Sequence, residues 1–145
     1  MELHSFSLEI RNHVAHLNFN RPEKSNSLHD AAWKEMKAVF EHLDDNPEVR
    51  VVLLGGAGKN FCAGIDLSML MDVSRHDHIT CEGRKREEMR KVIYHLQDCI
   101  TAIEKCRKPV IAAVQRACTG GGVDIVSAGD IRYCTDDAFF CFASS

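Results

Sequence analysis

Two glycine-containing turns carry the residue types best suited to chemistry in this sequence. One is Phe61-Cys62-Ala63-Gly64-Ile65-Asp66-Leu67, directly after an apolar run, and the other is Gly120-Gly121-Gly122-Val123-Asp124. Glycine lets a ligand approach the backbone closely, and the N-terminus of a helix offers unpaired N–H groups. Two such turns could direct two N–H donors at one carbonyl oxygen, which is the arrangement of an oxyanion hole. The alternative is that both are ordinary strand-to-helix turns.

Asp124 adds a carboxylate close to the second turn. It follows the central glycine, Gly121, by three residues. If Gly121 donates to a carbonyl oxygen, Asp124 would lie near the reacting carbons, where a carboxylate can act as a general acid or base.

Other patterns do not fit a known catalytic or metal-binding motif. The stretch Gly55 to Asn60 lacks the first glycine and the Ser or Thr of a phosphate-binding loop, and Ile125 replaces the first glycine of a nucleophile elbow around Ser127. His76 and His78 could form a metal pair, but no third ligand follows at a suitable spacing. We therefore expect a solvated loop there and no metal site.

Composition indicates one globular, soluble domain over residues 1–145. The apolar share is 45%, the charged share 27% and the formal net charge −3. This weak charge excludes a strongly basic nucleic-acid binder and a polybasic membrane patch, and no apolar stretch is long enough to span a membrane. The seven cysteines are odd in number and none form a C-x-x-C pair, so structural thiols in a reducing compartment are expected.

The elements that must position the two turns alternate between strand and helix. Ser27 is expected to cap a helix whose apolar residues recur at steps of three and four, and the polar stretch from Asp72 to Arg86 is expected to be a surface insert. Two further helices are expected from Met89 to Ile103 and from Val123 to Ala128. This order predicts an α/β fold with parallel crossovers; its strands are Phe6 to Ile10, Val14 to Phe19, Val51 to Leu54, Val110 to Val114, Asp130 to Cys134 and Ala138 to Phe142.

Several motifs in this order resemble the enoyl-CoA hydratase/isomerase (crotonase) superfamily. Both glycine turns take part in the resemblance, which covers nearly the whole chain. Within the superfamily, Asp124 and the segments 64–67, 130–134 and 137–140 resemble the delta(3,5)-delta(2,4)-dienoyl-CoA isomerases of fatty-acid β-oxidation, whereas ordinary hydratases carry Glu at the position of Asp124. The remaining motifs are Asn20-Arg21-Pro22, Asn26-Ser27-Leu28, Gly56-Ala57-Gly58-Lys59 and Lys108 to Val114.

The resemblance implies a crotonase-like ββα spiral, assembled as trimers or hexamers, that binds an acyl-CoA thioester. The thioester carbonyl would lie between the N–H groups of Ala63 and Gly121, and Asp124 would be catalytic. No metal or redox cofactor is implied, and the family works in mitochondria and peroxisomes. The residues implied to contact the substrate or its CoA moiety are Lys24, Ala63, Gly64, Ile65, Asp66, Leu67 and Gly121.

The sequence also departs from the family pattern. The isomerases place a Glu and a second Asp after the Phe139-Phe140 strand, but this sequence reads Cys-Phe-Ala-Ser-Ser and stops at Ser145. We therefore expect the N-terminal part of a truncated domain, without the last part of the spiral and the trimerisation helices, and with doubtful activity. Enoyl-CoA hydratase remains an alternative, as does a non-catalytic isoform that binds acyl-CoA or a full-length homologue. Arg116 occupies a position where the family usually has Gly, and strain is expected if that position needs a positive φ.

Overall fold

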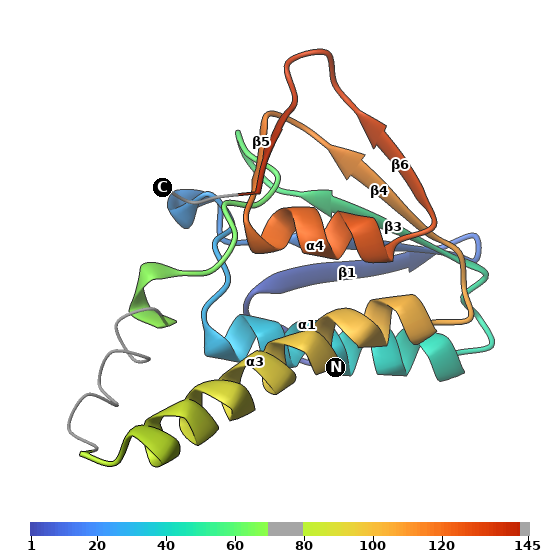
Figure 1. Cartoon of the computed structure of the whole chain (residues 1–145). Helices are drawn as coiled ribbons and strands as arrows, with labels where there is room; N and C mark the ends of the chain where they lie inside the picture. The colour runs from blue at the N-terminus through green and yellow to red at the C-terminus, as the bar shows by residue number, and fades with distance from the viewer. Residues whose placement is uncertain (70–79, 143–145) are drawn as a thin grey trace.

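A five-stranded sheet forms the frame of the chain in the computed structural model, which describes residues 1–69 and 80–142. The first strand pairs antiparallel with the second, and the remaining neighbours pair parallel. The α/β architecture and the parallel crossovers predicted from the sequence are thereby confirmed. The strands follow the spatial order β1 (Phe6–Arg11), β2 (Val14–Phe19), β3 (Val51–Gly56), β4 (Val110–Val114) and β6 (Ile131–Cys134) (Figure 1).

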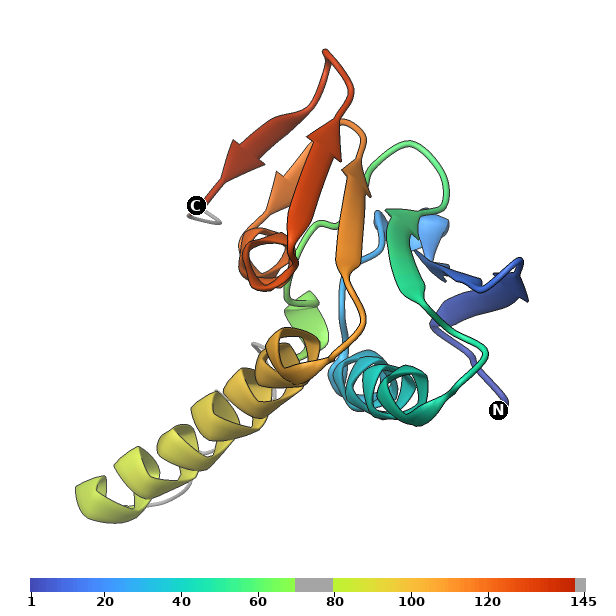
Figure 2. The same ribbon diagram turned by 90° about the vertical axis from the view of Figure 1, so that its right-hand side faces the viewer.

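The three long helices are α1 (Asp30–Asp45), α3 (Glu82–Lys105) and α4 (Gly121–Ala128), and α3 packs against both α1 and α4. The predicted apolar face of α1 is confirmed, because its aromatic and aliphatic residues at steps of three and four are buried against alternate residues of β2, β3 and β4. The N-terminal half of α3 projects away from the sheet (Figure 2). In the described part of the chain, no helix is long and apolar enough to cross a membrane.

The structure has a second sheet of two strands, of which the sequence predicted only the later one, within Ala138 to Phe142. Its strands are β5 (Ala117–Thr119) and β7 (Phe139–Cys141), which pair parallel. The sequence did not reveal β5, because three residues before a run of glycines are too short to show a strand period. The second sheet places β5 directly before the glycine turn that opens α4.

Apolar side chains are exposed on the last two strands. A sequence that stops after its last apolar strand also predicts that Val110 to Val114 lacks covering elements. This prediction is wrong, because β4 lies between β3 and β6 and buries Val110, Ala112 and Val114. The exposed residues of this region are Ile131, Tyr133, Phe139, Phe140 and Phe142.

The predicted starts of all three helices are wrong, and α4 begins at Gly121 rather than Val123. The residue that precedes α1 is His29 rather than Ser27, whose hydroxyl instead donates to Oδ2 of Asp66 at 3.0 Å. Helix α3 begins at Glu82, so the last part of the stretch predicted as a surface insert is helical. The first residues of that predicted insert, 72–79, which include His76 and His78, lie outside the described residues.

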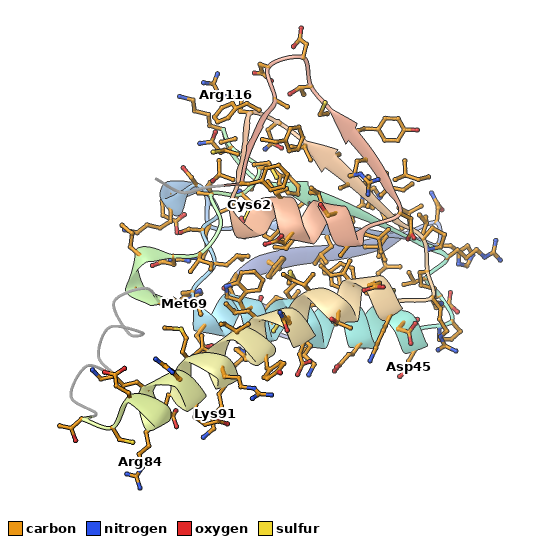
Figure 3. The ribbon with its side chains drawn as sticks, viewed as in Figure 1. Asp45, Cys62, Met69, Arg84, Lys91 and Arg116 are labelled. Atoms are coloured by element: carbon orange, nitrogen blue, oxygen red, sulfur yellow. The ribbon has the colours of Figure 1, made fainter. Side chains whose placement is uncertain are left out.

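Arg116 has the positive φ for which the family resemblance predicts strain. Its φ is +47°, a value that costs an L-residue free energy that glycine does not lose. Its side chain lies 4.0 Å from Asp137, and both side chains are about half exposed, so this ion pair contributes little. Figure 3 shows Arg116 on the outside of the molecule. Backbone strain therefore dominates at this position.

We expect Arg116→Gly to raise the free energy of unfolding by about 0.5–1 kcal/mol, because relief of the left-handed strain exceeds the added flexibility of glycine. Urea unfolding monitored by circular dichroism measures the change. Arg116→Ala is the control, since it removes the ion pair but keeps the strain. A glycine variant no more stable than the alanine variant would contradict the assignment of strain.

Candidate functional site

The two predicted glycine turns lie side by side. Cys62 forms a parallel bridge with Cys118 of β5: its N–H donates to the Ala117 carbonyl at 3.1 Å, and its own carbonyl accepts from the Thr119 N–H at 3.0 Å. The Thr119 hydroxyl also donates to the Ala63 carbonyl at 3.0 Å. Because β5 leads directly into α4, these bonds bring the first turn against the N-terminal end of α4, where Figure 3 shows Cys62.

The first turn is held on its other side by the loop that precedes α1. The Ala63 N–H donates to the Ser25 carbonyl at 2.9 Å. Leu28 bridges to Ile65, receiving a bond from the Asp66 N–H and donating one to the Gly64 carbonyl. The turn is therefore fixed between two segments that are distant in sequence.

Because of these bonds, the backbone N–H of the first turn that is available to a ligand differs from the predicted one. The N–H of Ala63, expected to face the ligand, is already bonded to Ser25. Ile65 lies between the two residues that bond to Leu28, and since alternate backbone groups of an extended segment point to opposite sides, its N–H points away from Leu28. Within residues 1–69 and 80–142, this N–H has no hydrogen-bond acceptor. The geometry thus favours Ile65 over Ala63 as the donor of this turn.

The second donor is at the start of α4. Gly121 is the first residue of the helix, and in the described part of the chain neither its N–H nor that of Gly122 has an acceptor. A Cβ atom placed on Gly64 would lie 3.1 Å from the Gly121 nitrogen, so the two turns are nearly in contact. The positive end of the helix dipole is at the same place and favours a developing negative charge.

Asp124 lies one helical turn beyond Gly121, on the same face of α4. Its side chain is exposed, and among the described residues it has no ion pair or side-chain hydrogen bond. Lys24 and Leu67 are exposed as well, whereas Gly64 and Gly121 are buried. The structure therefore leaves the Asp124 carboxylate open to a ligand or to solvent.

Asp66, expected to touch the CoA moiety, has a structural role in this chain. Its carboxylate accepts from the Ser68 N–H at 2.9 Å and from the Ser27 hydroxyl, and lies 3.4 Å from the guanidinium of Arg21. The bonds from Ser68, with the Ser27 bond and the Arg21 charge, lower the pKa of Asp66 to about 2. Because the Asp66 carboxylate is negatively charged and already paired within the protein, it is poorly suited to bind the anionic CoA moiety.

Asn26 is the buried residue that organises both loops. It belongs to the motif Asn26-Ser27-Leu28, but the sequence did not indicate this structural role. It is 1% exposed, and its Nδ2 lies 2.8, 3.0 and 3.1 Å from the carbonyl oxygens of Ala57, Asn60 and Phe61. Its Oδ1 accepts from the Arg21 N–H at 2.8 Å. One amide thus ties the loop before α1 to the loop that leads into the first glycine turn.

We expect Asn26→Asp to lower the free energy of unfolding by about 1–3 kcal/mol, since a carboxylate oxygen would face three carbonyl oxygens with no proton to share. Thermal and urea unfolding measure the loss. The matched control is Asn46→Asp, because the Oδ1 of Asn46 only accepts from the Glu48 N–H at 2.9 Å, a bond that a carboxylate makes equally well. Equal losses for the two variants would contradict this role of Asn26.

The cysteines near the site are unsuited to nucleophilic chemistry. Burial raises the pKa of Cys62 to about 12 and that of Cys118 to about 11, so both remain thiols at neutral pH. Cys99 and Cys106 are buried too, as predicted for several of the cysteines. Within the described ranges, no group of three or more His, Cys, Asp or Glu side chains could hold a metal ion.

Comparison with known proteins agrees with this geometry. Residues 9–145 match the family described as Enoyl-CoA hydratase/isomerase. The chain is 50% identical over 128 residues to the peroxisomal delta(3,5)-delta(2,4)-dienoyl-CoA isomerase of Arabidopsis thaliana, an alignment that covers 88% of this chain and 46% of the relative. It is 48% identical over 132 residues to the mitochondrial isomerase of Mus musculus, covering 88% of this chain and 39% of that protein.

The fold is shared with solved structures of the same family. An enoyl-CoA hydratase from Shewanella pealeana superimposes with a TM-score of 0.85 at 28% identity, over 96% of this chain and 49% of that one. The sequence thus spans about half the length, or less, of the proteins it matches. The crotonase-like fold and the family resemblance predicted from the motifs are confirmed, and the chain belongs to the enoyl-CoA hydratase/isomerase family.

Proposed function

We propose that the chain binds an acyl-CoA thioester and polarises its carbonyl group between the N–H groups of Ile65 and Gly121. The observation that carries the proposal is the pair of unbonded backbone donors on two adjoining turns, one of them at a helix N-terminus. Donors fixed in place before the ligand arrives favour the charge that develops on the thioester oxygen. We infer the reaction to be that of a delta(3,5)-delta(2,4)-dienoyl-CoA isomerase, the activity named for the relatives of 50% and 48% identity.

The chemistry of that reaction suits such a site. Moving a conjugated diene along a thioester requires the removal of a proton beside the carbonyl and the return of one at the far end of the diene. The intermediate is a dienolate, so negative charge grows on the thioester oxygen. Hydrogen bonds to that oxygen stabilise the transition state more than the substrate, which is the condition for catalysis.

Within this sequence, we assign proton transfer to Asp124. Its exposed carboxylate and its place one turn from Gly121 support the assignment. Leu67, in the first turn, and Lys24, next to the Ser25 that bonds to this turn, are both exposed and are proposed to contact the CoA moiety. The reaction as proposed uses no metal or redox cofactor. By analogy with the relatives named above, the chain would act in a peroxisome or mitochondrion. The family resemblance implies that it would assemble as a trimer or hexamer.

Gly121→Val tests the proposal by calorimetry with octanoyl-CoA, a saturated thioester that the site cannot convert. A Cβ atom on Gly121 would lie 3.2 Å from two ring carbons of Trp33, and the further methyl groups would fill the space over the donor. We expect the affinity to fall by about tenfold or more, since a blocked donor loses a hydrogen bond worth about 1 kcal/mol and the bulk adds to the loss.

The control is the same substitution at Gly83, where only the Cys81 sulfur lies within 4 Å of a new Cβ, at 3.8 Å. Gly83→Val should leave the affinity unchanged. Equal binding of octanoyl-CoA by the Gly121→Val and unmodified chains would refute the assignment of Gly121. Assays with 3,5-dienoyl-CoA and 2-enoyl-CoA separate the isomerase from the alternative hydratase.

A further inference from the structure

Trp33 lies beside Gly121, one of the two proposed donors. A Cβ atom on Gly121 would be 3.2 Å from Cζ2 and 3.2 Å from Cη2 of Trp33, and 3.8 Å from Cγ1 of Ile65. The space next to Gly121 is therefore closed by one edge of the indole and by the Ile65 side chain. Trp33 is 1% exposed, so the ring has little room to move away.

The indole N–H of Trp33 is buried without a partner. Only three buried side-chain nitrogens in the described part of the chain lack a hydrogen bond: Nδ1 of His29, Nε1 of Trp33 and Nε2 of His95. The His95 atom lies 3.2 Å from Oδ1 of Asp30, within ion-pair distance. His29 and Trp33 are four residues apart at the start of α1, so they share one face of the helix.

An unpaired buried N–H costs stability, and a phenylalanine at this position would fill much of the same space without that cost. The ring is also not anchored by a hydrogen bond of its own. It therefore meets Gly121 of α4 through packing alone. Small displacements of such a support change how well a backbone donor points at its acceptor.

We propose that Trp33 is a positioning residue of the oxyanion hole, holding the Gly121 N–H in line with the thioester oxygen. This inference rests on the proposed function and names the side chain that supports it. Two contributions to the binding free energy can then be measured separately. The acyl chain and CoA contribute whether or not the ligand has a carbonyl group. The alignment that Trp33 provides contributes only when a carbonyl oxygen is bound.

The first experiment uses the unmodified chain. Trp33 is its one tryptophan, so its fluorescence reports on this position alone. We expect octanoyl-CoA to change the Trp33 emission with the same midpoint that calorimetry gives, and free CoA, which has no acyl carbonyl, to leave the emission almost unchanged. Thioester binding without any change in emission would contradict a place for Trp33 beside the bound carbonyl.

The second experiment compares octanoyl-CoA with its thioether analogue, S-octyl-CoA, which lacks the carbonyl oxygen. We expect Trp33→Phe to reduce the preference for the thioester over the thioether at least threefold, with a smaller change in thioether affinity. Phe40→Leu is the matched control, since Phe40 is a buried aromatic residue of the same helix that lines a cavity of about 440 Å³ between α1 and α3. It should lower stability and leave the preference unchanged.

The outcomes distinguish this inference from the proposed function. If the unmodified chain binds neither ligand, or binds both equally, the oxyanion hole itself is refuted. If the unmodified chain prefers the thioester and Trp33→Phe retains the full preference, the oxyanion hole stands and the role of Trp33 is refuted. Urea unfolding of each variant shows that the compared proteins are folded.

Discussion

Gly64→Ala should lower the free energy of unfolding by about 2–6 kcal/mol, because two separate costs fall on one residue. Gly64 has a φ of +87°, a region that L-residues rarely adopt. A Cβ atom there would also lie 2.7 Å from the Thr119 carbonyl oxygen and 3.1 Å from the Gly121 nitrogen, both of them backbone atoms that cannot rotate away. The methyl group would force apart the two turns that form the site.

Gly120→Ala separates strain from steric overlap. Gly120 also has a positive φ, +54°, but nothing lies within 4 Å of its Cβ position. Its substitution should cost about 1–3 kcal/mol, the strain alone. Urea unfolding of both variants at the same protein concentration gives the comparison. If Gly64→Ala is no less stable than Gly120→Ala, the close approach of the two turns in this structure is wrong.

Much of the frame that supports these turns follows from local sequence patterns. The period of α1 and the apolar runs of β2, β3 and β4 predicted their elements, because each element buries one face against a single core. The terminal residues of these elements were less certain. Ser27 had the right side chain for a helix cap, but Asp66, distant in sequence, accepts its hydroxyl.

The sequence predicted which two turns form the site, but it did not predict which N–H group of the first turn is unbonded. The glycines at 64 and 121 indicated where a backbone could approach a ligand. Which N–H on the first turn is unbonded depends on the partners that the fold provides: Ser25 occupies the Ala63 donor, and the bridge to Leu28 turns the Ile65 donor outward. Those contacts join segments more than 30 residues apart, and no local pattern encodes them.

The chain of 145 residues should convert 3,5-dienoyl-CoA about 10²–10⁴-fold more slowly than the isomerase of Mus musculus, which corresponds to the usual contribution of general acid–base groups. Asp124 is the carboxylate that this sequence offers beside Gly121, and the two others that the family resemblance places after β7 are not among these residues. One carboxylate that must both remove and return the proton at distant ends of a diene is poorly placed for one of the two steps.

The reaction brings the diene into conjugation with the thioester carbonyl, and the longer-wavelength absorbance that this creates gives the rate. Asp124→Asn should abolish the remaining turnover while leaving the affinity for octanoyl-CoA within about twofold, because neutral and charged side chains differ little for a ligand bound through backbone donors. Exposed Phe139, Phe140 and Phe142 are expected to make the chain prone to aggregation, so the assay requires a monodisperse sample. A rate equal to that of the mouse enzyme would mean that Asp124 carries the proton transfer unaided.

The carbonyl stretching frequency of bound octanoyl-CoA, measured by isotope-edited infrared difference spectroscopy, tests the oxyanion hole most directly. Two fixed donors, the N–H groups of Ile65 and Gly121, weaken the thioester C=O bond more than water does. We expect the stretch to move to lower frequency when the thioester binds, and to return toward its value in water in Gly121→Val. A bound thioester whose carbonyl frequency equals that in water would contradict the oxyanion hole.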